Sequence, residues 1–66
     1  MQVRINGELR EIPEGTTVAG LLAQLGVKAA RVAVELNEGV VTKDRYEGQK
    51  IGPGDAVEIV AFVGGG

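Results

Sequence analysis

The 66-residue chain is predicted to fold as a two-layer α+β domain, a mixed four- to five-stranded sheet with one main helix packed on one face. The pair Asn6-Gly7 between two extended segments predicts a hairpin, because its tight turn needs positive φ angles. Apolar residues three and four positions apart then predict one amphipathic helix. Alternating apolar residues in the second half predict further strands. A helix that follows a hairpin and covers a mixed sheet gives two layers.

The hairpin strands are predicted on either side of Asn6-Gly7. Val3 and Ile5 alternate with polar residues, which is the period of a half-buried strand. The returning strand covers residues 8–12, but its apolar residues Leu9 and Ile12 are out of phase. This mismatch predicts either a bulge or one apolar side chain on the open face of the sheet.

The helix is predicted from an apolar stripe that consists of Val18, Leu21, Leu22 and Leu25. Thr17 is the expected N-cap, because its hydroxyl oxygen can accept a hydrogen bond from the first turn. Gly26 is the expected stop, because glycine readily adopts the left-handed conformation that ends many helices.

The second half of the chain is predicted to contain strands at residues 32–37, 49–51 and 56–63. Glu38-Gly39 is the predicted turn from the first of these into the short segment Val40-Val41. Polar residues 42–48 predict a single helical turn or a loop. Residues 52–55 suit a type II turn, with proline second and glycine third.

The last strand is predicted to have one core face and one partly exposed face. Its core face is expected to consist of Val57, Ile59, Ala61 and Val63. Val60 and Phe62 have the opposite parity and lie close to the end of the chain. One helix covers only one face of a sheet, so we expect these two side chains to be exposed. Adjacent exposed apolar side chains usually mark contacts, which predicts a partner-docking patch at Val60 and Phe62; the alternative is that neighbouring side chains cover both.

The composition disfavours several classes of function. The chain has no cysteine, histidine or serine, so it lacks a histidine base and the usual nucleophiles, and an enzyme is not expected. No thiolate metal site is possible, and no metal is predicted. Seven scattered basic residues and a net charge of −2 argue against nucleic acid. No apolar run is long enough for a membrane helix, and a cytoplasmic location is predicted.

The end of the sequence carries the strongest functional signal. We expect a folded domain at residues 1–63 and a flexible glycine tail at Gly64, Gly65 and Gly66. Three extended residues without side chains reach roughly 10 Å. Such a tail can carry the carboxylate of Gly66 through a narrow channel into a partner's active site. The alternative is a frayed tail or a cloning remnant.

Several stretches along the whole chain resemble one family. They are Asn6-Gly7, residues 15–18 leading into Leu21-Leu22, residues 32–37, residues 54–60, and residues 62–66. The combination is similar to the prokaryotic sulfur carriers of β-grasp (ubiquitin-like) fold, and within them to the ThiS family of thiamine biosynthesis.

The resemblance implies a mechanism. An E1-like (ThiF-like) adenylyltransferase uses ATP to activate the Gly66 carboxylate, and a cysteine desulfurase relay supplies sulfur to form a thiocarboxylate. A ThiG-like thiazole synthase then receives the sulfur. The chain itself is a protein co-substrate that binds no cofactor.

Other functions share part of this pattern. The small subunit of molybdopterin synthase and the carriers for tRNA thiolation are implied to have the same fold and a Gly-Gly end. A ubiquitin-like binding module with an inert tail is the alternative from another class. A terminal Gly66 favours a carrier, because an adaptor does not need to end there.

Overall fold

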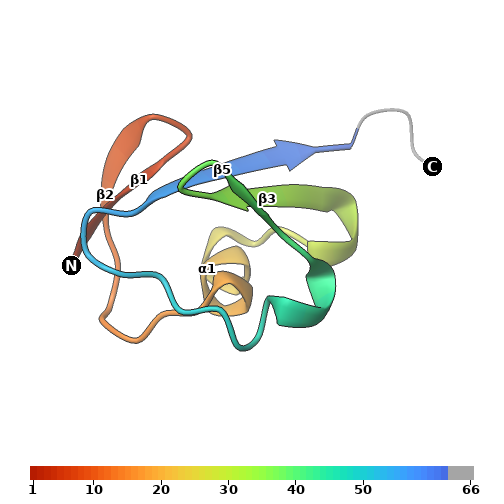
Figure 1. The fold of residues 1–66 in the computed structure, drawn as a ribbon, viewed down its shortest axis with the longest axis horizontal. Coiled ribbons are helices and arrows are strands. Elements are labelled where there is room, and N and C mark those ends of the chain that lie inside the picture. Colours follow the sequence, from red (N-terminus) through yellow and green to blue (C-terminus); the bar gives the residue numbers. More distant parts are fainter. Residues whose placement is uncertain (63–66) are drawn as a thin grey trace.

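The computed structural model describes residues 1–62. The described residues form a five-stranded sheet and one α-helix, and Figure 1 shows the helix lying against one face of the sheet. The elements are β1 (Gln2–Ile5), β2 (Glu8–Glu11), α1 (Val18–Leu25), β3 (Val32–Leu36), β4 (Gly39–Val41) and β5 (Ala56–Ala61). Two single turns of 3-10 helix, η1 (Ala29–Arg31) and η2 (Lys43–Arg45), complete the fold. The two-layer α+β prediction is confirmed.

The strand order is β2-β1-β5-β3-β4, which places the last strand at the centre of the sheet. β5 runs parallel to β1 and antiparallel to β3, so the sheet is mixed as predicted. The two remaining pairs, β1 with β2 and β3 with β4, are antiparallel hairpins. The central strand is therefore held on both sides, and its C-terminal end is where the chain leaves the sheet.

Both hairpin turns have two central residues with positive φ angles. Asn6 and Gly7 have φ values of 51° and 84°, which confirms the predicted turn. The second turn is formed by Asn37 and Glu38, at 50° and 72°, one residue earlier than the predicted Glu38-Gly39. Asparagine tolerates this conformation, and the side-chain oxygen of Asn37 also accepts a hydrogen bond of 2.9 Å from the backbone N–H of Ala56. These two properties place the turn earlier.

The side chain of Asn6 joins the first hairpin to the central strand. Its Oδ1 accepts a hydrogen bond of 2.7 Å from the backbone N–H of Ile59, and its Nδ2 donates one of 3.2 Å to the carbonyl oxygen of Ile59. β1 ends at Ile5, so the amide takes over the pairing that the backbone of β1 no longer provides. Asn6 thus serves the turn and the sheet together.

Replacement of Asn6 by alanine is expected to destabilise the protein by about 1–3 kcal/mol. Alanine removes both hydrogen bonds to Ile59 and is less tolerant of the left-handed turn. Asn6→Gly keeps the turn conformation and loses only the hydrogen bonds. Its stability should therefore lie between that of the unsubstituted protein and that of Asn6→Ala. Urea unfolding of the three proteins measures this order. A stability of Asn6→Ala equal to that of the unsubstituted protein would show that the clamp is unimportant.

The helix has both of the predicted ends. The hydroxyl oxygen of Thr17 accepts a hydrogen bond of 3.1 Å from the N–H of Gly20, which confirms the N-cap. Gly26 has a φ of 71° and its N–H bonds to the carbonyl oxygen of Ala23. The N–H of the following Val27 bonds to the carbonyl oxygen of Leu22 at 2.9 Å. These two bonds form a Schellman motif, which satisfies carbonyl groups left open at the end of α1.

The core lies between α1 and the sheet, and it includes a residue that sequence reasoning missed. The buried apolar residues are Val3, Ile5, Ile12, Val18, Leu21, Leu22, Val32, Val34, Val41, Tyr46, Ile51 and Val57. Tyr46 is 3 % exposed although it lies in the polar segment 42–48. The prediction of a helical turn in that segment is confirmed by η2. This turn places Tyr46 under the sheet, and the N–H of Ala19 donates to its carbonyl oxygen at 2.9 Å.

The predicted strand at residues 49–51 does not join the sheet. Its backbone pairs instead with the segment that leads into α1, through an isolated bridge between Thr17 and Lys50. The N–H of Ile51 donates to the carbonyl oxygen of Thr16 at 2.9 Å. β4 takes the place of the short strand, because the tight turn after β3 brings residues 39–41 back alongside it.

The hairpin has no bulge. The regular register pairs Leu9 with Arg4 on the open face, and Leu9 is 59 % exposed. Ile12 lies beyond the end of β2, where the chain is free to turn, and it is buried. The second of the two predicted explanations, one apolar residue on the open face, is therefore confirmed.

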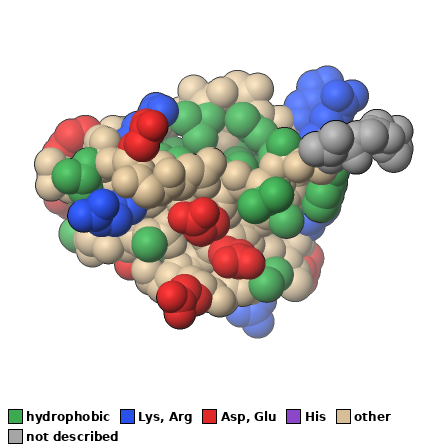
Figure 2. All heavy atoms as spheres, turned by 90° about the horizontal axis from the view of Figure 1, so that it is seen from above, with side chains coloured by type: hydrophobic (Ala, Val, Ile, Leu, Met, Phe, Trp, Pro, Cys, Tyr) green, Lys and Arg blue, Asp and Glu red, His purple; other side chains and the backbone are tan. Residues whose placement is uncertain are grey.

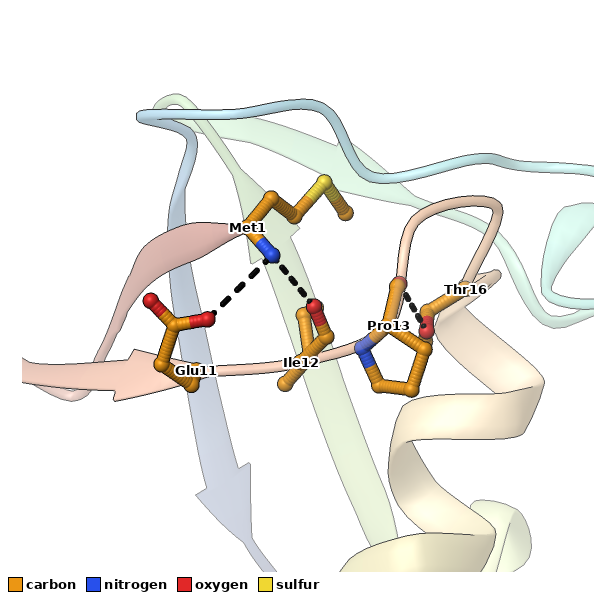
Figure 3. A network of polar contacts seen from close by, with 5 residues as sticks. All are labelled: Met1, Glu11, Ile12, Pro13 and Thr16. Carbon is orange, nitrogen blue, oxygen red and sulfur yellow. Dashed lines mark hydrogen bonds and ion pairs between the residues drawn. The ribbon is translucent and has the colours of Figure 1, made fainter.

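The edge of the hairpin is tied to the segment before the helix. In Figure 3 the amino group of Met1 points toward the carbonyl oxygen of Ile12, at 2.7 Å, and toward the carboxylate of Glu11, at 3.4 Å. The hydroxyl of Thr16 donates a hydrogen bond of 2.6 Å to the carbonyl oxygen of Pro13 in the same figure. These contacts fix the path of the chain from β2 into α1.

Candidate functional site

The candidate site is the C-terminal end of β5 and the residues that follow it. The predicted tail residues Gly64, Gly65 and Gly66 lie outside the described residues, and so does Val63, which was expected to face the core. The structure describes the chain up to Phe62. The described part of the site consists of Phe62 and the surfaces around it.

Val60 and Phe62 are exposed, as predicted. Val60 pairs with Ala33 of β3 on the face opposite α1, and its exposed fraction is 59 %. Phe62 follows the strand, and its exposed fraction is 60 %. The N–H of Phe62 donates a hydrogen bond of 2.9 Å to the carbonyl oxygen of Arg31, which continues the pairing by one residue. Two apolar side chains thus lie in solvent beside the point where the chain leaves the sheet.

The opposite face of β5 is buried only in part. Val57 is fully buried and Ile59 is partly buried, but Ala61 is exposed, so its predicted place in the core is wrong. An open groove of about 420 Å³ lies beside Ala61, between the first hairpin and the C-terminal end of α1. Since α1 has only eight residues, it does not cover the end of the central strand.

The groove is lined mainly by apolar side chains, among them Leu25, Val27 and Ile59. Its charged lining residues are Glu8 and Arg10, and both are exposed. A carboxylate oxygen of Glu8 lies 3.9 Å from a guanidinium nitrogen of Arg10. Among the described residues, Glu8 is the one carboxylate in this lining, and it is exposed and faces Arg10.

The open face of the sheet mixes apolar and acidic side chains. Figure 2 looks onto this face and shows separate groups of hydrophobic side chains with acidic side chains between them. Glu35 of β3 lies directly opposite Glu58 of β5, and both are exposed. Val40 of β4 is 75 % exposed. Like charges in directly opposed positions weaken a sheet, so this arrangement does not serve stability.

Lys43 is a feature of the site that sequence reasoning missed. Its ammonium group donates hydrogen bonds of 2.9 Å to the carbonyl oxygens of Ala29 and Val32. The same nitrogen lies 5.4 Å from the centre of the Phe62 ring and 5.7 Å from that of Tyr46. In the sequence Lys43 belongs to a polar segment with no pattern that links it to Phe62. The fold alone brings them together.

The described part of the chain shows little sign of catalytic or metal chemistry. Residues 1–62 contain no cluster of three or more side chains that could hold a metal ion. A hydrogen bond from Thr42 lowers the pKa of Asp44, which is fully exposed on η2. A lowered pKa keeps this carboxylate ionised, the usual state at neutral pH, and does not make it a general acid or base. No helix among these residues is long and apolar enough to cross a membrane.

Comparison with known proteins points to one family. The sequence model of the ThiS family matches residues 3–66. The sulfur carrier protein ThiS of Thermus thermophilus is 39% identical over 64 residues, which are 97% of this chain and 98% of that protein. The thiazole synthase of Paramagnetospirillum magneticum is 47% identical over 66 residues, all of this chain but only 20% of that protein. This chain thus spans about a fifth of the thiazole synthase that it matches.

A solved structure agrees with the sequence comparison. The crystal structure of the thiamine biosynthesis protein ThiS from Geobacter metallireducens has a TM-score of 0.87 and 36% sequence identity, and the match covers 100% of both chains. The five-stranded mixed sheet with one helix is thus the β-grasp fold that the resemblance implied. On the matched family model, the similar carrier and this shared fold, the chain belongs to the ThiS family.

Proposed function

We propose that this chain is a sulfur carrier for the thiazole part of thiamine. The observation that carries the proposal is the family match, which extends to the three final glycines. The absence of cysteine, histidine and serine agrees with it, because the carboxyl group of Gly66 is then the natural place to carry sulfur. The thiazole synthases that match all of this chain favour thiazole as the product.

The proposed reaction has three steps. An E1-like (ThiF-like) adenylyltransferase joins the Gly66 carboxylate to the α-phosphate of ATP and releases pyrophosphate. A persulfide from a cysteine desulfurase relay then displaces AMP, and reductive cleavage of its S–S bond leaves a thiocarboxylate. A ThiG-like thiazole synthase takes the sulfur and leaves the carboxylate again. The activation is needed because a carboxylate is a poor electrophile, whereas an acyl-adenylate has a good leaving group.

In this proposal the chain is a co-substrate and supplies no catalytic group. It binds no cofactor of its own, since ATP is bound by the activating partner. Gly64, Gly65 and Gly66 enter the partner's channel, and Val60 and Phe62 form the patch on which the partner docks. Their exposure beside the end of β5 supports this role, because a partner that holds the patch also receives the tail. The proposed location is the cytoplasm.

Mass spectrometry tests the proposed function. The protein is incubated with a ThiF-type adenylyltransferase, ATP, a cysteine desulfurase, cysteine and a thiol reductant. The expected product has one oxygen replaced by sulfur, and fragmentation places the change at Gly66. Omission of ATP is the control and should leave the mass unchanged. A protein that releases no pyrophosphate and gains no sulfur with several such enzymes would contradict the proposal.

A further inference from the structure

Lys43 connects three parts of the chain that are distant in the sequence, namely η2, the stretch of η1 and β3, and the end of β5. It lies on η2, and its ammonium group bonds to carbonyl oxygens of η1 and of the first residue of β3. The ring of Phe62, directly after β5, lies 5.4 Å from the same nitrogen. Cations at this distance from an aromatic ring are attracted to it. One side chain therefore ties the end of the central strand to the segments beside it.

The ammonium group of Lys43 is engaged by the two carbonyl oxygens and the Phe62 ring. No ion pair with a carboxylate engages Lys43 within residues 1–62, where the ion pairs involve Met1 with Glu11 and Arg10 with Glu8. Among the described residues, Phe62 has one backbone hydrogen bond, to Arg31, and most of its side chain is in solvent. The contact with Lys43 is thus the second restraint on Phe62. One restraint acts on the backbone of this residue and the other on its ring.

We infer that Lys43 is a positioning residue, which holds Phe62 so that the following residues leave the sheet in the direction that the activating enzyme requires. This inference rests on the proposed carrier function. It assigns to a lysine outside the docking patch a role in the rate of activation. Lys43 does not touch the reacting carboxylate in this scheme and acts only through Phe62.

The geometry explains why a small change at Phe62 matters. Four extended residues, the form that threading requires, span roughly 13 Å. The direction in which the chain leaves Phe62 sets where such a segment starts and which way it first points. Misplacement of a reacting group by about 1 Å can lower a rate by about 100-fold. A restraint at Phe62 therefore raises the fraction of docked molecules whose carboxylate reaches the ATP.

Lys43→Met tests the inference, because methionine keeps an unbranched apolar side chain and removes the ammonium group. We expect kcat for pyrophosphate release to fall about tenfold, with KM for the carrier within about twofold. The amide hydrogen of Phe62 should exchange about ten times faster. Lys43→Arg should restore most of both values, because a guanidinium group can also donate to carbonyl oxygens and stack on a ring.

Lys50→Met is the matched control. The side chain of Lys50 makes no hydrogen bond or ion pair within residues 1–62, so this variant should behave as the unsubstituted protein. All variants are assayed at a temperature below their thermal unfolding midpoints, so that a lower rate cannot result from unfolding. If Lys43→Met folds too poorly for this, Phe62→Leu, which removes the ring, should show the same fall in kcat.

Two results would overturn the inference. One is an unchanged kcat in Lys43→Met. The other is a raised KM with an unchanged kcat, which would mean that Lys43 shapes the docking surface and not the delivery of the tail. Failure of the proposed function looks different, because the unsubstituted protein would then release no pyrophosphate at all. A normal rate in that protein and in Lys43→Met together would reject only the role of Lys43.

Discussion

Deletion of Gly65 and Gly66 is expected to abolish ATP-dependent pyrophosphate release with a ThiF-type adenylyltransferase. The shortened chain would end about 7 Å before the reacting position, which is beyond the reach of any local adjustment. We expect a fall of more than about 100-fold, because loss of alignment between reacting groups has effects of this size. A radiolabelled ATP–pyrophosphate exchange assay measures it. One residue added after Gly66 should have the same effect, because it replaces the reactive carboxylate with an amide.

The stability of the shortened protein is the control for this prediction. The core lies within residues 3–57, so the urea midpoint should not change. Equal activity of the extended and the unextended protein would contradict the role of Gly66. A large fall in stability would instead show that the tail contributes to the fold.

Leu21→Ala is expected to have the largest effect on stability. The side chain of Leu21 is 1 % exposed and packs between α1 and the sheet. Removal of a buried leucine side chain costs about 2–5 kcal/mol, and a domain of this size has a total stability of only about 3–10 kcal/mol. Urea unfolding, followed by circular dichroism, measures the loss. Leu9→Ala is the matched control, because Leu9 is 59 % exposed and its replacement should cost less than about 0.5 kcal/mol.

Phe62→Ala should separate docking from stability in the same experiment. The ring is 60 % exposed, so its loss should cost well under the roughly 3–5 kcal/mol of a buried phenylalanine. Binding to the adenylyltransferase should nonetheless weaken, since Phe62 belongs to the proposed docking patch. If Phe62→Ala proves more destabilising than Leu21→Ala, the assignment of faces on β5 is wrong. Ile59 is a poorer probe of the core, because it is only partly buried.

The local elements could be predicted from the sequence because each depends on neighbouring residues. The turn at Asn6-Gly7 follows from the backbone preferences of two residues. The ends of α1 follow from Thr17 and Gly26, which satisfy the open hydrogen-bonding groups of a single helix. The exposure of Val60 and Phe62 followed from alternation along one strand together with a helix on only one face.

The predictions that were wrong depend on contacts between distant segments. The turn before β4 lies at Asn37-Glu38 because the side chain of Asn37 bonds to Asp55, just before β5, and to Ala56, its first residue. Ile51 pairs with Thr16 and not with the sheet. Ala61 is exposed because α1 ends before it covers the end of β5. No periodic pattern contains this information.

The sequence by itself determined the fold class, the capped helix, the exposed pair Val60 and Phe62, and the resemblance that identified the family. These properties are encoded locally, by periodicity, by turn and cap residues, and by motifs along the chain. Only the tertiary structure placed Tyr46 in the core and Lys43 beside Phe62. Those contacts arise when η2 packs beneath the sheet, next to a strand that follows it by more than ten residues. Their energies depend on segments that meet only in the folded chain.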